Sequence, residues 1–321
     1  MRRELTAFIF PGQGSQKVGM GRALADAFPE ARAVFDEADA AFAASGGGSA
    51  RLSSLCFEGP DDQLMLTEHT QPAILTVSVA AARVLAKHGI EPDVVAGHSL
   101  GEYSADVVAG VFGFGDAVQM VRRRGRYMQE AVPLGEGAMA AILGLDAERV
   151  QRACAEAAQG EVVSPANINS PDQVVIAGTA AAVQRASERA KALGAKRALP
   201  LAVSAPFHCA MMKPAEERLA PELWALAVRD PRVPIVANVD AQPKQQGPAA
   251  IDALVRQVSA PVLWEAIVRR LASDGVTTYV EVGPGRVLGG LVKKIHKEAQ
   301  VLSFAEPGDL EEILASAKFK V

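Results

Sequence analysis

Three observations predict an α/β fold in which a small domain is inserted into a larger one. Short apolar runs alternate with longer helical patterns in both terminal parts of the chain, as in the βαβ units of a parallel sheet. The runs at 6–10 and 93–97 each end in a glycine-containing turn, where such a sheet presents its functional residues. Between about residues 131 and 205 the order of predicted elements changes to βαββαβ, the order of a ferredoxin-like domain.

The large domain is predicted from segments on both sides of the insertion. An Ala/Val/Leu-rich helix at about 70–87 precedes the strand at 93–97, and another helix opens at Ser99. After Ser204 the alternation resumes, with strands at 233–237 and 278–282 and helices between and after them. The stretch 242–248 is predicted to be a loop. We therefore assign residues 1–130 and 206–321 to a large α/β domain.

The small domain is predicted to span residues 131–205. Its expected strands and helices, in chain order, are strand 138–143, helix 146–158, strands 162–168 and 173–177, helix 179–193 and strand 196–201.

Composition narrows the classes of protein that fit. Of the 321 residues 49% are hydrophobic, and the net charge of -4 gives no general attraction to nucleic acid or anionic lipid. The longest mostly apolar run, 73–82, is too short to cross a membrane. Three widely spaced cysteines suggest neither a disulfide framework nor a zinc site, so a cytoplasmic location without a metal is expected: Cys56, Cys154 and Cys209.

The turn at 97–101, Gly-His-Ser-Leu-Gly, has the Gly-x-Ser-x-Gly pattern of a nucleophile elbow. In such an elbow a sharp strand-to-helix turn lifts the serine hydroxyl above the sheet, and the glycines leave room for it. A plain turn with Ser99 as helix N-cap would not by itself need glycine on both sides. We predict that Ser99 is the nucleophile of an acyl-transfer enzyme.

A serine hydroxyl needs a base within hydrogen-bond reach. Only two histidines follow Ser99 in the chain, His208 in a loop and His296 among lysines on a helix predicted to face solvent. His208 is therefore the candidate base. His98 adjoins the nucleophile and is predicted to point away from it, either as a packing residue or as one that supports the site from behind.

The tetrahedral intermediate needs two hydrogen-bond donors for its oxyanion. The backbone N–H of Leu100, directly after the nucleophile, is one candidate. The other is the backbone N–H of Gln13 in the glycine-rich loop after the first strand. Four arginines at 122–126 lie on the helix after the elbow, and one of them beside Ser99 would select a substrate with a carboxylate. The pattern alone does not choose between Arg123 and Arg124.

Six motifs, in order along nearly the whole chain, resemble those of the malonyl-coenzyme A:acyl carrier protein transacylases of bacterial fatty-acid synthesis. They are Phe-Pro-Gly-Gln-Gly-Ser-Gln at 10–16, Gly-His-Ser-Leu-Gly-Glu-Tyr at 97–103, Met-Gln-Glu-Ala-Val-Pro at 128–133, Ala-Asn-Ile-Asn-Ser-Pro at 166–171, His-Cys-Ala-Met-Met-Lys-Pro at 208–214 and Glu-Val-Gly-Pro-Gly at 281–285.

The resemblance implies a hydrolase-like large domain and a role for each matching residue. Ser99 would be the nucleophile and His208 the base, and the backbone carbonyl of Gln257 would orient the histidine. The remaining implied residues are the backbone N–H groups of Gln13 and Leu100 in the oxyanion hole, Arg124 as the partner of the malonyl carboxylate, and Asn167 and Asn169 lining the cleft. The substrate would be malonyl-coenzyme A and the partner an acyl carrier protein that brings its own phosphopantetheine, with no cofactor and a monomeric enzyme.

Phe207 departs from the commonest form of the family, which often has a small residue before the histidine. In related polyketide synthase domains a phenylalanine there accompanies malonyl, so a free-standing acyltransferase of a polyketide synthase is an alternative. A serine esterase is a second, because Asp116 and Asp172 lie between Ser99 and His208 in chain order. A silent module that only binds coenzyme A or a carrier protein is a third.

Overall fold

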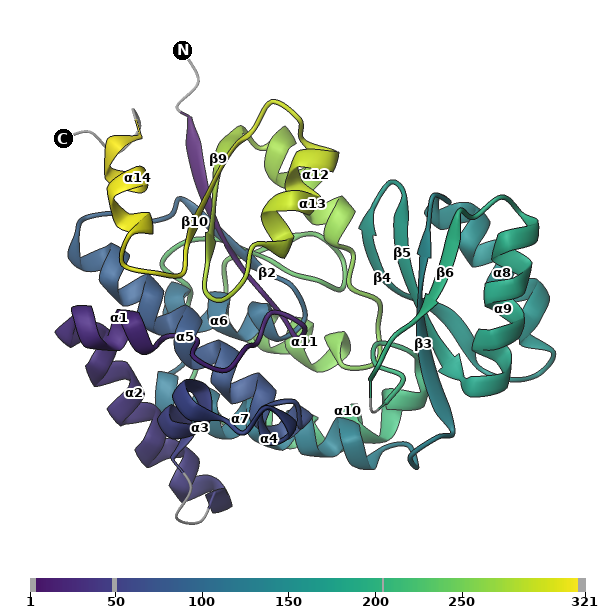
Figure 1. The fold of residues 1–321 in the computed structure, drawn as a ribbon, viewed down its shortest axis with the longest axis horizontal. Coiled ribbons are helices and arrows are strands. Elements are labelled where there is room, and N and C mark those ends of the chain that lie inside the picture. Colours follow the sequence, from purple (N-terminus) through teal and green to yellow (C-terminus); the bar gives the residue numbers. More distant parts are fainter. Residues whose placement is uncertain (1–3, 48–50, 204, 317–321) are drawn as a thin grey trace.

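A computed structural model describes residues 4–47, 51–203 and 205–316, which form two separate sheets with their own helices (Figure 1). The larger sheet has six strands in the order β10-β9-β1-β2-β7-β8. All neighbours in it are parallel except β7 and β8. In chain order its strands are β1 (Leu5–Phe10), β2 (Val94–Gly97), β7 (Ile235–Val236), β8 (Pro243–Lys244), β9 (Val276–Val282) and β10 (Gln300–Phe304).

Both faces of the central strand β1 are buried. Phe8 and Phe10 belong to the apolar cluster on one face, and Ala7 and Ile9 belong to the cluster on the other. Because successive side chains of a strand point to opposite faces, a strand covered on both sides must be apolar throughout. This accounts for the uninterrupted apolar run at the start of the sequence.

Helices cover the two faces unequally. The second face packs against α12 (Trp264–Ser273) and α13 (Val287–Ile295). The first packs against a larger group that includes α2 (Pro29–Phe42), α5 (Thr67–Lys87), α6 (Leu100–Ala109) and α7 (Phe114–Glu130). Further helices in the chain segments around this sheet are α1 (Arg22–Ala27), η1 (Ala43–Gly47), α3 (Leu52–Glu58), α4 (Asp61–Leu64), η2 (Ala210–Met212), α10 (Lys213–Trp224), α11 (Gly247–Gln257) and α14 (Asp309–Ala315).

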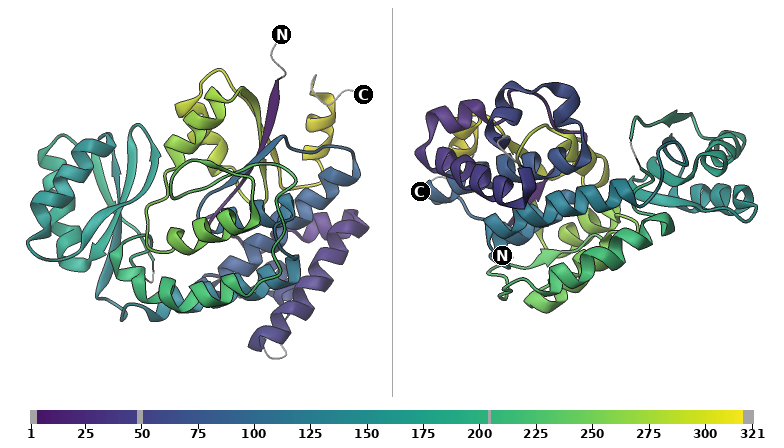
Figure 2. Two further views of the ribbon diagram at one scale, coloured as in Figure 1. Left: turned by 180° about the vertical axis from the view of Figure 1, so that it is seen from behind. Right: turned by 90° about the horizontal axis from the view of Figure 1, so that it is seen from below.

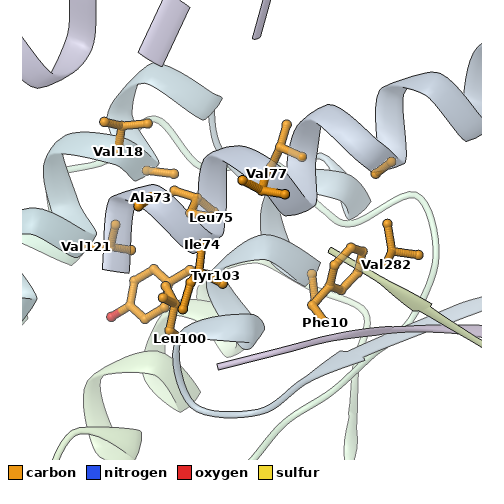
Figure 3. Packing of buried hydrophobic residues seen from close by; sticks show 14 of the residues in the cluster. Phe10, Ala73, Ile74, Leu75, Val77, Leu100, Tyr103, Val118, Val121 and Val282 are labelled. Atoms are coloured by element: carbon orange, nitrogen blue, oxygen red, sulfur yellow. The ribbon is translucent and has the colours of Figure 1, made fainter. Parts of the chain in front are cut away.

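Helix α5 is the centre of the larger core. It packs against both α6 and α7, with Ile74 close to Leu100 and Tyr103 of α6 (Figure 3). At the crossing with α7 the backbones approach so closely that a Cβ atom on Gly125 would lie 2.6 Å from the carbonyl oxygen of Thr67. This crossing fixes the register of α7, which carries the arginine cluster.

The second sheet is antiparallel, in the order β4-β5-β3-β6, and projects from one end of the molecule with α8 and α9 (Figure 2). Its elements confirm the βαββαβ order: β3 (Gly137–Leu143), α8 (Ala147–Ala158), β4 (Val163–Ser170), β5 (Gln173–Thr179), α9 (Ala180–Ala192) and β6 (Arg197–Pro200). The α/β architecture predicted from the sequence is thus confirmed. The exact boundaries at 131 and 205 stay a prediction.

Backbone hydrogen bonds join the edge of the small sheet to the rest of the molecule. The N–H of Ile168 in β4 donates to the carbonyl of Val262 at 2.9 Å, and the N–H of Val262 donates to the carbonyl of Ala166 at 2.8 Å. Val262 lies between α11 and α12. An ion pair between Lys294 and Asp172 adds a second link. These contacts hold β4 beside the carboxyl ends of the large-sheet strands.

Three sequence expectations differ in detail from the structure. The strand expected at 233–237 is only two residues long, and the loop expected at 242–248 contains the two-residue strand β8 that pairs with it. His296 does not lie on a solvated helix face. It follows α13 as a half-buried residue whose Nδ1 is 3.2 Å from the hydroxyl of Tyr279. No helix within the described ranges combines the length and apolar character needed to span a bilayer.

Replacing Gly125 by alanine should lower the free energy of unfolding by about 1–3 kcal/mol, because the new methyl group has no room against α5. Gly290→Ala on α13 is the matched control. A Cβ there meets nothing within 4 Å, so this substitution should raise the free energy of unfolding by about 0.5–1 kcal/mol. Urea denaturation of both variants measures the difference. Equal stabilisation by the two would show that the α5–α7 crossing is not tight.

Candidate active site

Ser99 lies in a sharp turn between β2 and α6, with φ 51° and ψ -106°. A positive φ is unfavourable for a serine, so the surrounding structure must hold the turn in place. The two flanking glycines show how. A Cβ on Gly97 would lie 2.0 Å from the carbonyl oxygen of Gly101, and one on Gly101 would lie 2.0 Å from that of Phe10. The two ends of the turn therefore pack directly against each other, and Gly101 packs against the end of β1. The elbow motif predicts this tight packing.

Ser99 and His208 are hydrogen-bonded. The Oγ of Ser99 is 2.7 Å from Nε2 of His208, and Nδ1 of His208 is 3.0 Å from the backbone carbonyl oxygen of Gln257. Because a carbonyl can only accept, Nδ1 carries the proton and Nε2 is free to accept the proton of the serine hydroxyl. Burial, and next the positive charge of Arg124, lower the pKa of His208 to about 3. The imidazole is thus neutral at physiological pH, as a base must be.

The third position of this arrangement is a carbonyl rather than a carboxylate. Asp116 and Asp172, the acids that an esterase triad would require, are both exposed. Asp172 bonds to Ser170 and Lys294 instead. In the described part of the chain the order Ser-acid-His therefore does not produce an esterase triad.

Arg124 points at Ser99 from α7. It is 1% exposed, and its Nη2 donates to Ser99 Oγ at 3.1 Å and to Gln257 Oε1 at 2.8 Å. Its Nη1 donates to Gln71 Oε1 at 2.8 Å. The neighbouring Arg123 instead pairs with Glu222. The choice that the sequence pattern left open is thus decided by orientation, in favour of Arg124.

The side chains that receive the Arg124 bonds are all neutral, so its charge has no directly bonded carboxylate among the described residues. The guanidinium also lies over the ring of Tyr103, with 5.4 Å between its central carbon and the ring centroid. A buried charge with only neutral partners is costly to fold. It is also a prepared site for an anionic group that enters beside Ser99.

Two backbone N–H groups are available near Ser99 for an oxyanion. Leu100 is the first residue of α6, where backbone N–H groups have no partner within the helix. Gln13 lies in the loop after β1, which is pressed against the elbow: a Cβ on Gly12 would lie 2.5 Å from the carbonyl oxygen of His98. The N–H of Ser99 itself donates to Oδ1 of Asn238 at 2.7 Å, so it is already occupied.

Ser99 opens into a cleft of about 590 Å³ between the two sheets. The lining residues come from the loop after β1, the residues just before and at the start of α5, the elbow, α7, β3, β4, the residues after β6 and the segment around His208. They are Gln13, Gly14, Gln16, Met65, Thr67, His98, Ser99, Met128, Met139, Asn167, Leu201, Ala202, Val203, Phe207 and His208. The cleft therefore contains Phe207 and Asn167, as the family resemblance implies.

Asn169 differs from its predicted place. It is buried behind the cleft, where its Oδ1 accepts a hydrogen bond from Nε2 of His98 at 2.8 Å. The ring of His98 also packs on Trp264. His98 is thus a packing residue as predicted, although one side of it also borders the cleft. Asn169 therefore does not line the cleft, but it contacts His98, which does.

Three polar residues near the elbow were not expected from the sequence. Gln71 binds Arg124, and the buried Asn238 binds the backbone on both sides of His98. Glu102 accepts hydrogen bonds from the Asn238 N–H and the Gln257 side chain. Burial raises the pKa of Glu102 to about 7. The carboxyl group of Glu102, at the otherwise apolar start of α6, could have indicated a functional role from the sequence. No sequence feature around Asn238 indicated one.

Comparison with known proteins shows which family the chain belongs to. The family model for the acyl transferase domain matches residues 7–315. The chain belongs to the acyl transferase family. This acyl transferase is 47% identical over 313 residues to a malonyl CoA-acyl carrier protein transacylase of Bacillus subtilis, and the alignment covers 97% of each chain.

Two solved structures have the same fold as this acyl transferase. An acyl carrier protein S-malonyltransferase of Vibrio cholerae superposes with a TM-score of 0.93 at 47% identity, covering 97% of this chain and all of the other. A malonyl-transacylase solved in complex with a type II PKS acyl-carrier protein gives 0.92 at 48% identity and covers 98% of this chain and 99% of its own. The fold and the acyltransferase activity expected from the sequence are confirmed.

The raised pKa of Glu102 should make its contribution to stability depend on pH. Between its ordinary value near 4.5 and about 7, the folded chain holds a proton that the unfolded chain has lost, so wild-type stability falls as the pH rises through this range. Glu102→Gln lacks this effect. Its free energy of unfolding relative to wild type should therefore rise by up to about 3 kcal/mol from pH 5 to pH 8.

Denaturant unfolding of both proteins at the two pH values tests this. Glu298→Gln, which removes an exposed carboxylate, is the control. A Glu102→Gln difference that is the same at both pH values would contradict the expected titration.

Proposed function

We propose that this acyl transferase moves malonyl from malonyl-coenzyme A to the phosphopantetheine thiol of an acyl carrier protein through a malonyl ester on Ser99, and so supplies chain elongation in fatty-acid synthesis. The observation that carries the proposal is the buried guanidinium of Arg124, bonded only to neutral acceptors and 3.1 Å from Ser99 Oγ. The names of the relatives, which describe malonyl transfer to acyl carrier protein, support it.

The first half-reaction loads Ser99. As Oγ attacks the thioester carbonyl, its proton passes to Nε2 of His208, while the Gln257 carbonyl holds the Nδ1 proton. The N–H groups of Gln13 and Leu100 receive the oxyanion. Collapse of the tetrahedral intermediate breaks the carbon–sulfur bond. The departing coenzyme A thiolate takes the proton from His208.

The second half-reaction reverses these roles with a different thiol. His208 takes the proton of the carrier thiol, whose sulfur attacks the malonyl ester. When the new intermediate collapses, the carbon–oxygen bond breaks and His208 returns the proton to Ser99 Oγ. Malonyl is thereby stored on Ser99 between the two steps, and no cofactor takes part.

Arg124 gives this cycle its specificity. A guanidinium can bind both oxygens of a carboxylate, and charged hydrogen bonds contribute about 1.5–3 kcal/mol each. A bound malonyl carboxylate would also offset the charge that lowers the pKa of His208, making the imidazole a stronger base when substrate is present. Phe207, at the cleft wall, leaves less room for a branched acyl unit.

The setting that we propose is a cytoplasmic monomer that meets coenzyme A thioesters and a carrier protein. Three buried free cysteines are compatible with a reducing compartment. The relative solved with a type II PKS carrier favours one alternative, service to a polyketide synthase. Transfer rates to purified fatty-acid and polyketide carriers would separate the two pathways.

Mixing the protein with malonyl-coenzyme A should give a malonyl adduct on the peptide that contains Ser99, seen by mass spectrometry, and Ser99→Ala should give none. The adduct should accumulate because no carrier thiol is present to accept the malonyl group from the ester. Absence of an adduct on wild-type protein would favour a module that only binds its ligands. Fast release of free malonate without carrier would favour a serine esterase.

Arg124→Ala should lower malonyl transfer about tenfold to hundredfold while acetyl transfer is spared or raised, since only malonyl carries the carboxylate. Rates with malonyl- and acetyl-coenzyme A measure this. Arg123→Ala, which loses an ion pair with Glu222, should leave the ratio of the two rates unchanged. An unchanged ratio in Arg124→Ala would remove Arg124 from substrate selection.

A further inference from the structure

Asn238 follows β7 and is fully buried directly beneath the nucleophile turn. Its side-chain Oδ1 accepts the backbone N–H of Ser99 at 2.7 Å, and its Nδ2 donates to the backbone carbonyl of Gly97 at 2.6 Å. One amide group therefore connects the last residue of β2 to the serine two positions later. Asn238 does not line the cleft.

The two hydrogen bonds of the Asn238 side chain hold the nucleophile turn, whose backbone conformation is unfavourable. Ser99 has a positive φ of 51°, a conformation that does not persist unless neighbouring groups hold it. The Asn238 amide spans the turn and fixes the direction of the Ser99 N–H. Because the Ser99 carbonyl is held as well, by Nε2 of Gln257 at 2.9 Å, both peptide groups beside the Ser99 Cα are restrained, and with them the direction of the Cα–Cβ bond that carries Oγ.

Asn238 is itself held by Glu102. A single carboxylate oxygen, Oε2, accepts the Asn238 backbone N–H at 3.0 Å and the Gln257 Nε2 at 2.7 Å. The same Nε2 donates to the Ser99 carbonyl at 2.9 Å. Gln257 also supplies the carbonyl that orients His208. The supports of the nucleophile and of the base therefore meet at one buried carboxylate.

We propose that Asn238, held by Glu102, is a positioning residue that places Ser99 Oγ within reach of His208 Nε2. It touches no substrate and acts through Ser99. By occupying the Ser99 N–H it also leaves the Leu100 N–H as the elbow's donor to the oxyanion. The inference rests on the proposed function, in which Ser99 is the nucleophile.

Asn238→Ala should lower the rate of Ser99 acylation about 100-fold, because a small displacement of a reacting atom has effects of this size. Asn238→Asp keeps an oxygen for the Ser99 N–H but turns a second oxygen toward the Gly97 carbonyl. Its rate should fall about tenfold, as expected for one lost hydrogen bond. The KM for malonyl-coenzyme A should stay within about twofold in both, because Asn238 does not border the cleft.

Rapid quenching followed by mass spectrometry gives the acylation rate, scaled to the fraction of molecules that become labelled at long times. A merely structural role would reduce that fraction and leave the scaled rate unchanged. Gln242→Ala, an exposed position in the same connection whose side chain bonds to Arg270, is the control and should keep the wild-type rate.

A wild-type scaled rate in Asn238→Ala would overturn the inference. If that variant does not fold, Asn238→Asp decides in the same way, because it preserves the shape of the side chain. Wild-type protein that forms no adduct on Ser99 would instead overturn the proposed function, and the inference with it. The two failures are therefore distinguishable.

Discussion

The end of β1 and the turn after β2 approach each other so closely that only glycine fits between them. The carbonyl of Phe10 accepts the N–H of His98 at 3.0 Å, and it lies where a side chain at Gly101 would have to go. Because the two strands are neighbours in a parallel sheet, this contact lies at its carboxyl edge. It brings the loop that carries Gln13 beside Ser99, so the positions of both proposed oxyanion donors, the N–H groups of Gln13 and Leu100, depend on it.

Around this fixed turn the site concentrates positive charge and excludes negative charge. Arg124 is buried among amide and hydroxyl acceptors, and its charge adds to burial in keeping His208 neutral. The buried carboxyl group of Glu102 has its pKa raised by burial and accepts hydrogen bonds from two N–H donors. The arrangement suits a reaction whose substrate brings its own carboxylate and whose base must start without a proton.

The antiparallel sheet forms one wall of the cleft. Its edge strand β4 supplies Asn167 to the wall and Asn169 to the support of His98. The bonds between β4 and Val262 hold that wall in place. Phe207 and His208 follow this sheet in the chain, and His208 contacts Ser99, so the proposed base comes from a part of the chain more than a hundred residues after the proposed nucleophile.

The sequence by itself determined the alternation of strands and helices, the βαββαβ order and the elbow turn that contains Ser99, the proposed nucleophile, because these depend on local periodicity and on residues adjacent in the chain. It also led to His208 as the proposed base by elimination. Which arginine faces Ser99, where Asn169 lies, and that Glu102 and Asn238 support the turn were decided by the tertiary structure. Helix rotation and the packing of α6 against β7 and α11 bring distant residues together, and no pattern within a segment records that.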